Sequence, residues 1–218
     1  PQPSPGRVMV AEPNGSVTRL NRGWEAGMTA LAWGNLEAHP EPDPLDELVH
    51  ALACGISGYV RKTGHNSVVL GLSGGLDSAL VATLAAVALG PEAVHGLCMP
   101  SRYSSSGSLE DAQDLAARLG MVHLHEIGIE PIHEALRLSL QPVLGAVAGV
   151  TDENLQARAR GVLVMGLANA QGLLPLATGN KSELAVGYST LYGDMCGALL
   201  PLGDVFKSKC YELAVHIN

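Results

Sequence analysis

The sequence has little positive charge. Thirteen lysines and arginines stand against 21 aspartates and glutamates in 218 residues, and the formal net charge is −8. A chain without a basic field does not attract a phosphate backbone, so we do not expect nucleic acid as a partner. A small phosphate-bearing ligand remains possible, because a few local donors can hold it whatever the net charge of the chain.

Cysteines are scarce and scattered, with no Cys-x-x-Cys pair among Cys54, Cys98, Cys196 and Cys210. The simplest interpretation is buried free thiols in a reducing compartment, which predicts a cytoplasmic protein. The sequence also lacks a signal-peptide pattern and any apolar run long enough to span a bilayer. A membrane is therefore not expected as a partner.

The length suits one domain, or one domain with an arm, and 47% hydrophobic residues supply a core. The first residues are rich in proline and glycine, and a hairpin could form over residues 7–20 around Asn14-Gly15. Prolines between residues 37 and 44 predict a linker. We therefore divide the chain into an N-terminal arm, residues 1–42, and a domain, residues 43–218. The chain begins with Pro instead of Met, so we expect it to be trimmed.

From residue 43 onward, strand patterns alternate with helical patterns. Apolar strands are predicted at 68–72, 94–100, 121–127 and 173–178, and helices at 43–62, 79–89, 108–119, 130–144, 151–171 and after 204. This order predicts an α/β fold with a doubly wound, mostly parallel sheet of about five strands and helices on both faces. Pro175 should stand at the start of its strand. Ser108 and Asp204 should cap the helices that follow them.

The most informative stretch is residues 68–78, Val-Val-Leu-Gly-Leu-Ser-Gly-Gly-Leu-Asp-Ser. A buried strand, a glycine turn and a helix N-terminus together make an anion site, since free N–H groups and the helix dipole both face the turn. Ser73 and Ser78 add hydroxyl donors. Asp77 would repel a phosphate unless a cation lies between them, so it implies Mg²⁺. The alternative is a capped glycine turn that holds no ligand.

No lysine follows these glycines, which excludes the Gly-Lys-Ser/Thr nucleotide loop, and the spacing is not Gly-x-Gly-x-x-Gly. The stretch resembles the Ser-Gly-Gly-x-Asp-Ser loop of the ATP pyrophosphatases, which hold the pyrophosphate of ATP while a nucleophile takes the AMP. This resemblance implies an ATP-binding loop made of Gly71, Leu72, Ser73, Gly74, Gly75, Leu76, Asp77 and Ser78.

Other polar residues lie where further strands and helices begin or end. Arg102 follows the second strand, where it could contact nucleotide or simply be solvated. Asn154 and Arg158 share a helix face, whereas Arg160 points elsewhere and is expected at the surface. His123 and His125 share one strand face. A metal pair is conceivable there, but no third ligand is evident, so we interpret them as ordinary strand histidines.

Further stretches resemble the synthetase domain of NAD synthetase, in its glutamine-dependent branch. The resemblance covers about residues 43–218 and adds three segments, 99–105, 153–158 and 178–195. It implies an adenine nucleotide α-hydrolase-like fold and a ligase. In the implied reaction, the carboxylate of deamido-NAD attacks the α-phosphorus of ATP and releases pyrophosphate. Ammonia then displaces AMP from the acyl-adenylate and leaves NAD.

The same resemblance implies a role for individual residues. Thr178 and Lys207 would join the ATP site, with Asp77 and Lys207 as the catalytic pair, while Arg102 is included in that site only for its position after the second strand. Glu183 would bind Mg²⁺ together with Asp77; alternatively it merely caps the short helix at 180–187. The positions that correspond to deamido-NAD contacts are Asn154, Arg158 and Glu183.

Departures from the family pattern qualify this picture. Leu191 and Ala198 replace a lysine and an aspartate of the ammonia-only branch, which favours the glutamine-dependent branch. That branch carries a nitrilase-like glutaminase domain that residues 1–42 cannot house, and the family continues past the last helix. We therefore expect an excised or degenerate synthetase domain that uses ammonia, with a separate or removed glutaminase, and a homodimer as in the family.

Two other functions remain open. One is a different amidating or adenylating enzyme of the ATP pyrophosphatase type, with another acceptor in place of deamido-NAD. The other is a non-catalytic ATP-binding domain, which the expected truncation favours. Conversion of ATP to AMP with a defined acceptor would separate these possibilities.

Overall fold

The structure of the chain is a computed structural model that describes residues 6–20, 23–24 and 41–218. The chain forms two compact units, Pro1–Gly55 and Ile56–Asn218. The boundary between them falls inside helix α1 (Pro44–Lys62). The second unit contains the glycine turn and all of the predicted site residues.

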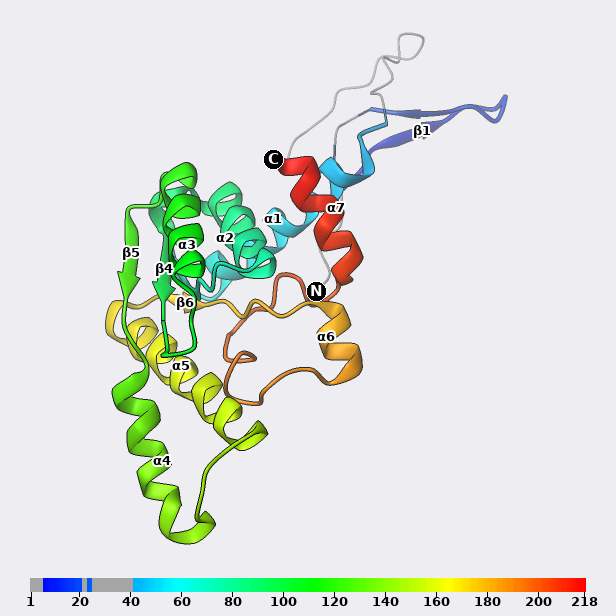
Figure 1. The fold of residues 1–218 in the computed structure, drawn as a ribbon. Coiled ribbons are helices and arrows are strands. Elements are labelled where there is room, and N and C mark those ends of the chain that lie inside the picture. Colours follow the sequence, from blue (N-terminus) through cyan, green and yellow to red (C-terminus); the bar gives the residue numbers. More distant parts are fainter. Residues whose placement is uncertain (1–5, 21–22, 25–40) are drawn as a thin grey trace. The chain divides into compact units, whose positions relative to one another are not determined.

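A four-stranded parallel sheet lies at the centre of the second unit, in the order β5-β4-β3-β6. Figure 1 shows β4 and β5 as arrows that point the same way. The predicted parallel α/β sheet is confirmed, with four strands in the described residues where about five were expected. The strands are β3 (Val68–Gly71), β4 (Val94–Cys98), β5 (His123–Glu126) and β6 (Leu174–Pro175).

Helices cover both faces of this sheet. On one face, Val69 of β3 and Leu97 of β4 pack with Val164 and Ala168 of α5 (Val150–Gln171). Because side chains alternate along a strand, the neighbouring residues of β3 and β4 face the other side, and α2 (Leu76–Leu89) packs against both strands. Helix α3 (Ser106–Leu119) packs against β4 and α2. The predicted doubly wound arrangement is confirmed.

Three local predictions are wrong. Helix α3 starts earlier than predicted, because Ser105 is its N-cap and accepts a hydrogen bond from the Ser108 N–H at 3.2 Å. Asp204 does not cap the last helix, α7 (Lys207–Ile217), whose N-cap position is Phe206; the Asp204 carboxylate lies 3.4 Å from the Lys181 ammonium instead. Pro175 ends β6, which is tolerated because the N–H groups that bond to the β3 side belong to its neighbours, Leu174 and Leu176.

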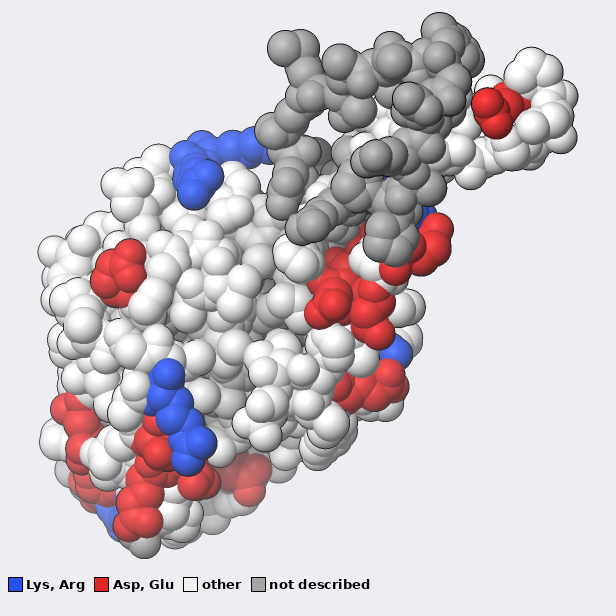
Figure 2. All heavy atoms as spheres, turned by 90° about the horizontal axis from the view of Figure 1, so that it is seen from above, with Lys and Arg blue, Asp and Glu red and all other residues white. Residues whose placement is uncertain are grey.

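Charged side chains do not form a continuous basic area on the face shown in Figure 2, as far as the described residues extend. The lysines and arginines stand in separate small groups, several of them next to aspartates or glutamates. No helix in the described part of the chain is long and apolar enough to cross a membrane.

The remaining helices are α4 (Glu130–Leu144), α6 (Lys181–Val186) and the short 3₁₀ turn η1 (Pro91–Ala93).

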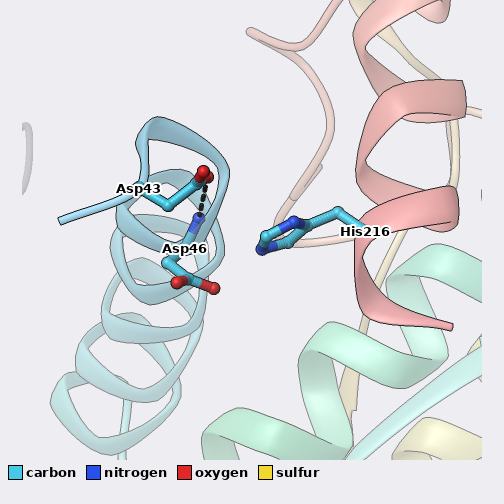
Figure 3. Close-up of side chains that lie close together, drawn as sticks. All are labelled: Asp43, Asp46 and His216. Carbon is cyan, nitrogen blue, oxygen red and sulfur yellow. Dashed lines mark hydrogen bonds between the residues drawn. The ribbon is translucent and has the colours of Figure 1, made fainter.

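The N-terminal unit contains the predicted hairpin. Strands β1 (Met9–Ala11) and β2 (Val17–Arg19) pair antiparallel, and Gly15 in the turn has a φ of +87°, which suits glycine. The start of α1 is capped by Asp43, whose Oδ1 accepts hydrogen bonds from the N–H groups of Leu45 at 2.7 Å and Asp46 at 3.4 Å (Figure 3). Of the predicted linker, residues 37–40 lie outside the described residues.

Candidate active site

The glycine turn lies at the carboxyl end of the central strand β3, as predicted. Its own serines shape it: Ser73 Oγ lies 3.1 Å from Ser78 Oγ, and the Ser78 hydroxyl donates to the Gly75 carbonyl at 3.0 Å. Gly75 occupies the N-cap position of α2 and offers no side chain to the first helical turn. The N–H groups at the start of α2 are therefore open to an anion.

Gly74 is required by close packing. Its φ is +75°, and a Cβ at this position would lie only 2.4 Å from the backbone oxygen of Ser108 in α3. Both the backbone angle and the space therefore demand glycine. The glycine turn consequently rests directly on the first turn of α3.

Two cavities open beside this turn. The first, of about 380 Å³, lies among Gly71–Ser73, the end of β4, the start of α3 and one face of α5. The second, of about 420 Å³, lies among the turn, Thr178, α6 and the start of α7. Every residue predicted to bind ATP lines one of these cavities, with the exceptions of Gly74 and Arg102.

Asp77 forms the centre of a polar cluster in the second cavity. The Lys207 ammonium donates to both Asp77 carboxylate oxygens at 2.8 Å, and the Asn180 amide donates to Asp77 Oδ2 at 3.1 Å. Burial by itself lowers the pKa of Lys207, but the hydrogen bond and charge of Asp77 more than compensate, and the pKa lies above its usual value. Lys207 is therefore held in its charged form beside the glycine turn.

Glu183 has the capping role that the sequence left open. Its Oε2 accepts from the Asn180 N–H at 2.9 Å, while the Asn180 side chain accepts from the Glu183 N–H at 3.1 Å, which makes a capping box at the start of α6. Glu183 also lines the second cavity together with Asp77. Capping and metal binding are compatible, because a carboxylate has two oxygens and several lone pairs.

Arg102 lies outside both cavities. Its guanidinium pairs with Glu130 of α4, with Nε 2.6 Å from Oε1, and lies 3.6 Å from Glu134. The contact between Arg102 and nucleotide stays a prediction.

Asn154 and Arg158 both contact the loop after α6. Asn154 Oδ1 accepts from the Thr190 hydroxyl at 2.8 Å, and Arg158 Nε donates to the Leu191 carbonyl at 3.2 Å. This loop continues into Gly193 and Asp194, which line the first cavity. The two side chains thus help to position a loop that lines the first cavity, and their contact with deamido-NAD stays a prediction.

Arg160 is a site residue that the sequence analysis missed, and the expectation that it lies at the surface is wrong. It lines the first cavity and is half-buried, with its Nε donating to the Met99 carbonyl at 3.2 Å. The missed signal is spacing: Arg160 shares its helix face with Ala157 and Val164, which also line this cavity.

A third histidine joins the pair on β5. Because β4 and β5 pair in register at His95 and His123, the two imidazole rings stack with centroids 4.0 Å apart, and His125 lies 6.1 Å from His95. Burial and the neighbouring histidines lower the pKa of His95.

The four cysteines are free thiols, as predicted, and Cys98 and Cys210 are buried.

The family model described as NAD synthase matches residues 48–218. The chain belongs to the NAD synthase family. A curated glutamine-dependent NAD(+) synthetase of Rhodobacter capsulatus is 44% identical over 217 residues, which is 95% of this chain and 39% of that protein. The chain thus spans about two fifths of the length of this relative and 34% of the one from Thermotoga maritima.

Solved structures of the family have the same fold. The glutamine-dependent NAD+ synthetase of Acinetobacter baumannii, in complex with ADP, is 46% identical with a TM-score of 0.80, over 83% of this chain and 34% of that one. The NH3-dependent NAD synthetase of Campylobacter jejuni, in complex with nitrate, is 37% identical with a TM-score of 0.75, over 81% and 74% of the two chains. The predicted resemblance to NAD synthetase and its adenine nucleotide α-hydrolase-like fold are confirmed.

Proposed function

We propose that this chain catalyses the ATP-dependent amidation of deamido-NAD to NAD, with ammonia as nitrogen donor and AMP and pyrophosphate as further products. The observation that supports this most is the meeting of the phosphate-binding turn with Asp77, Glu183 and Lys207 at one cavity, although they come from separate segments of the chain. The named activities of the similar NAD synthetases agree with it.

The proposed chemistry explains why ATP is needed. A carboxylate resists attack by a nucleophile, and adenylation turns its oxygen into part of a leaving group. The deamido-NAD carboxylate would form a bond to the α-phosphorus as pyrophosphate leaves, and ammonia would then attack the carbonyl carbon as AMP leaves. Charge builds up on phosphate oxygens, which the N–H groups of the turn and Lys207 would stabilise electrostatically.

The donor set of the second cavity suits Mg²⁺, because Asp77 and Glu183 both present carboxylate oxygens there. Asp77 Oδ1 accepts a hydrogen bond from Lys207 alone, so its second lone pair would be open to Mg²⁺. Bound Mg²⁺ would offset the charge of the ATP phosphates. The third N–H of the Lys207 ammonium, which Asp77 does not use, would pair with a phosphate oxygen.

The remaining roles are assigned in the same way. Thr178 lines both cavities and would contact ATP, together with Gly71–Ser78 and Arg102. Deamido-NAD would be held by Asn154, Arg158 and Glu183. The synthetase domain would comprise residues 43–218, preceded by the arm 1–42, in a cytoplasmic protein that receives ammonia from solution or from a glutaminase.

The proposed assembly is a homodimer. Exposed apolar side chains on α4 and α5, among them Leu138, Val143 and Val162, offer a surface for a second copy. Light scattering on the purified chain would measure its mass in solution. A single-chain mass at all concentrations would contradict the dimer.

Product analysis tests the proposed reaction. The chain would be incubated with ATP, Mg²⁺, deamido-NAD and ammonium, and AMP and NAD would be separated by chromatography. Equal amounts of AMP and NAD, absent when deamido-NAD is omitted, are expected. AMP formed only with another acceptor would support a different amidating enzyme, and tight ATP binding without AMP would support a non-catalytic domain.

A further inference from the structure

Arg160 differs from the other half-buried arginines among the residues that the structure describes. Arg7, Arg19 and Arg137 each lie close to a carboxylate, of Glu47, Glu41 and Asp152 respectively. Arg160 is half-buried, and its single hydrogen bond within the described residues runs from Nε to the Met99 carbonyl. No carboxylate of the described residues lies within ion-pair distance of its guanidinium.

An unpaired charge in this position is unfavourable for the free protein. Burial lowers the pKa of Arg160, and no neighbouring carboxylate offsets that effect. A partly desolvated cation without a counter-ion costs free energy, which a ligand of opposite charge would recover. The cavity that Arg160 lines is large enough to hold part of a nucleotide.

The same cavity receives the positive end of a helix dipole. Ser104, Ser105 and Ser108 at the start of α3 line it, and the first turn of this 14-residue helix contains no acidic residue. Asp194 is the acidic residue that lines the cavity, and it is exposed, with its Oδ1 accepting from the Thr190 N–H at 2.8 Å. Arg160 and the α3 N-terminus therefore favour an anion from two sides.

We propose that Arg160 binds an anionic oxygen of a substrate inside the first cavity. This inference rests on the proposed function, whose two substrates each bring such a group: a phosphoryl group, or the nicotinate carboxylate. A guanidinium suits both, because its planar fork can donate two parallel hydrogen bonds to either anion. Arg160 would thus select substrates by charge, in a cavity adjoining the one that holds Asp77 and Lys207.

Ligand pairs that differ at the anion separate the two sources. Calorimetric titration would compare AMP with adenosine, which lacks the phosphate, and deamido-NAD with NAD, which has an amide in place of the carboxylate. The variant is Arg160→Gln, because glutamine keeps an N–H donor for the Met99 carbonyl while removing the charge. The matched control is Arg118→Gln on α3, since Arg118 pairs with the exposed Asp114 and lines neither cavity.

Arg160→Gln is expected to weaken binding of the ligand that brings the contacted anion by about tenfold or more, and to leave binding of its counterpart without that anion unchanged. If Arg160→Gln binds AMP more weakly than the parent does, or binds both deamido-NAD and NAD more weakly, Arg160 contacts a phosphoryl group. If it binds only deamido-NAD more weakly, Arg160 contacts the carboxylate. Unchanged affinity for all four ligands overturns the inference while the proposed function stands, and a parent chain that binds none of them overturns both.

A second variant guards against loss of folding. If Arg160→Gln melts below the assay temperature, Arg160→Lys takes its place, because lysine keeps the charge but cannot form the paired hydrogen bonds. We expect it to weaken the same ligand to a smaller extent. An equal loss of affinity for the ligands with and without the anion would overturn the inference.

Discussion

The Lys207 ammonium contacts both carboxylate oxygens of Asp77 at 2.8 Å, although the two residues lie 130 positions apart in the chain. Asp77 belongs to the first turn of α2, and Lys207 is the first residue of α7. The pair ties the last helix to the glycine turn. A metal at Asp77 would share this carboxylate with Lys207.

Asp77→Asn should lower the affinity for Mg-ATP by about tenfold or more, because it removes a charged ligand from the metal position. Stability should change by about 1 kcal/mol or less, since the pair with Lys207 is only partly buried. Calorimetry with and without Mg²⁺ measures the first effect. The control is Asp204→Asn, because Asp204 forms an exposed ion pair with Lys181. Parent-like Mg-ATP affinity in Asp77→Asn would exclude a role of Asp77 in metal binding.

Glu183→Gln should abolish AMP formation from ATP, deamido-NAD and ammonium at a nearly unchanged melting temperature. Glutamine preserves the capping box with Asn180 but has no charge for Mg²⁺. Glu183→Ala removes both the charge and the cap, so it should also lower the free energy of unfolding by about 1 kcal/mol. Full activity of the Gln variant would show that Glu183 serves only as a cap.

Gly74→Ala should destabilise the fold by about 1–3 kcal/mol and abolish ATP binding, because its Cβ would meet the Ser108 backbone at 2.4 Å and its φ is positive. The neighbouring Gly75→Ala is a matched control, since the added Cβ lies 3.1 Å from the Ser73 hydroxyl, which can rotate. Thermal melts and ATP titration of both variants test this. Equal effects of the two substitutions would contradict the packing argument.

Acid should destabilise the chain through the histidine stack. The pKa of His95 is lowered by burial and by His123 and His125, so the unfolded chain takes up a proton near pH 6.5 that the folded chain resists. The stability present above pH 6.5 is therefore lost as the pH falls below it. In urea titrations from pH 7.5 to 5, His95→Gln should flatten this loss, whereas His50→Gln at an exposed site should not.

High pH should destabilise the folded chain through ionisation of Cys210. Burial, with a smaller contribution from the charge of Asp77, raises the pKa of this thiol from 9.0 to about 11. The unfolded thiol ionises first, so the stability present below pH 9 is lost as the pH rises towards 11. Urea titrations over this range should show a shallower loss for Cys210→Ala than for the parent. Identical slopes would contradict this origin.

Much of the site follows from local sequence. The run at 68–78 contains its own strand, turn and helix start, so its conformation depends mainly on neighbours in the chain and on the two glycines. The alternation of strands and helices likewise sets a parallel sheet, and the carboxyl ends of parallel strands meet at one edge. Asp77 and Glu183 could therefore be placed at the same cavity before any coordinates were known.

Local residue patterns were enough to predict the family, the parallel α/β sheet and the position of the glycine turn. Three further relationships became visible only in the folded chain: Lys207 pairs with Asp77, Arg102 pairs with Glu130, and Arg160 lines a cavity. Folding also brought His95 against His123. These relationships depend on strand register and on the packing of distant helices, which no local pattern of residues specifies.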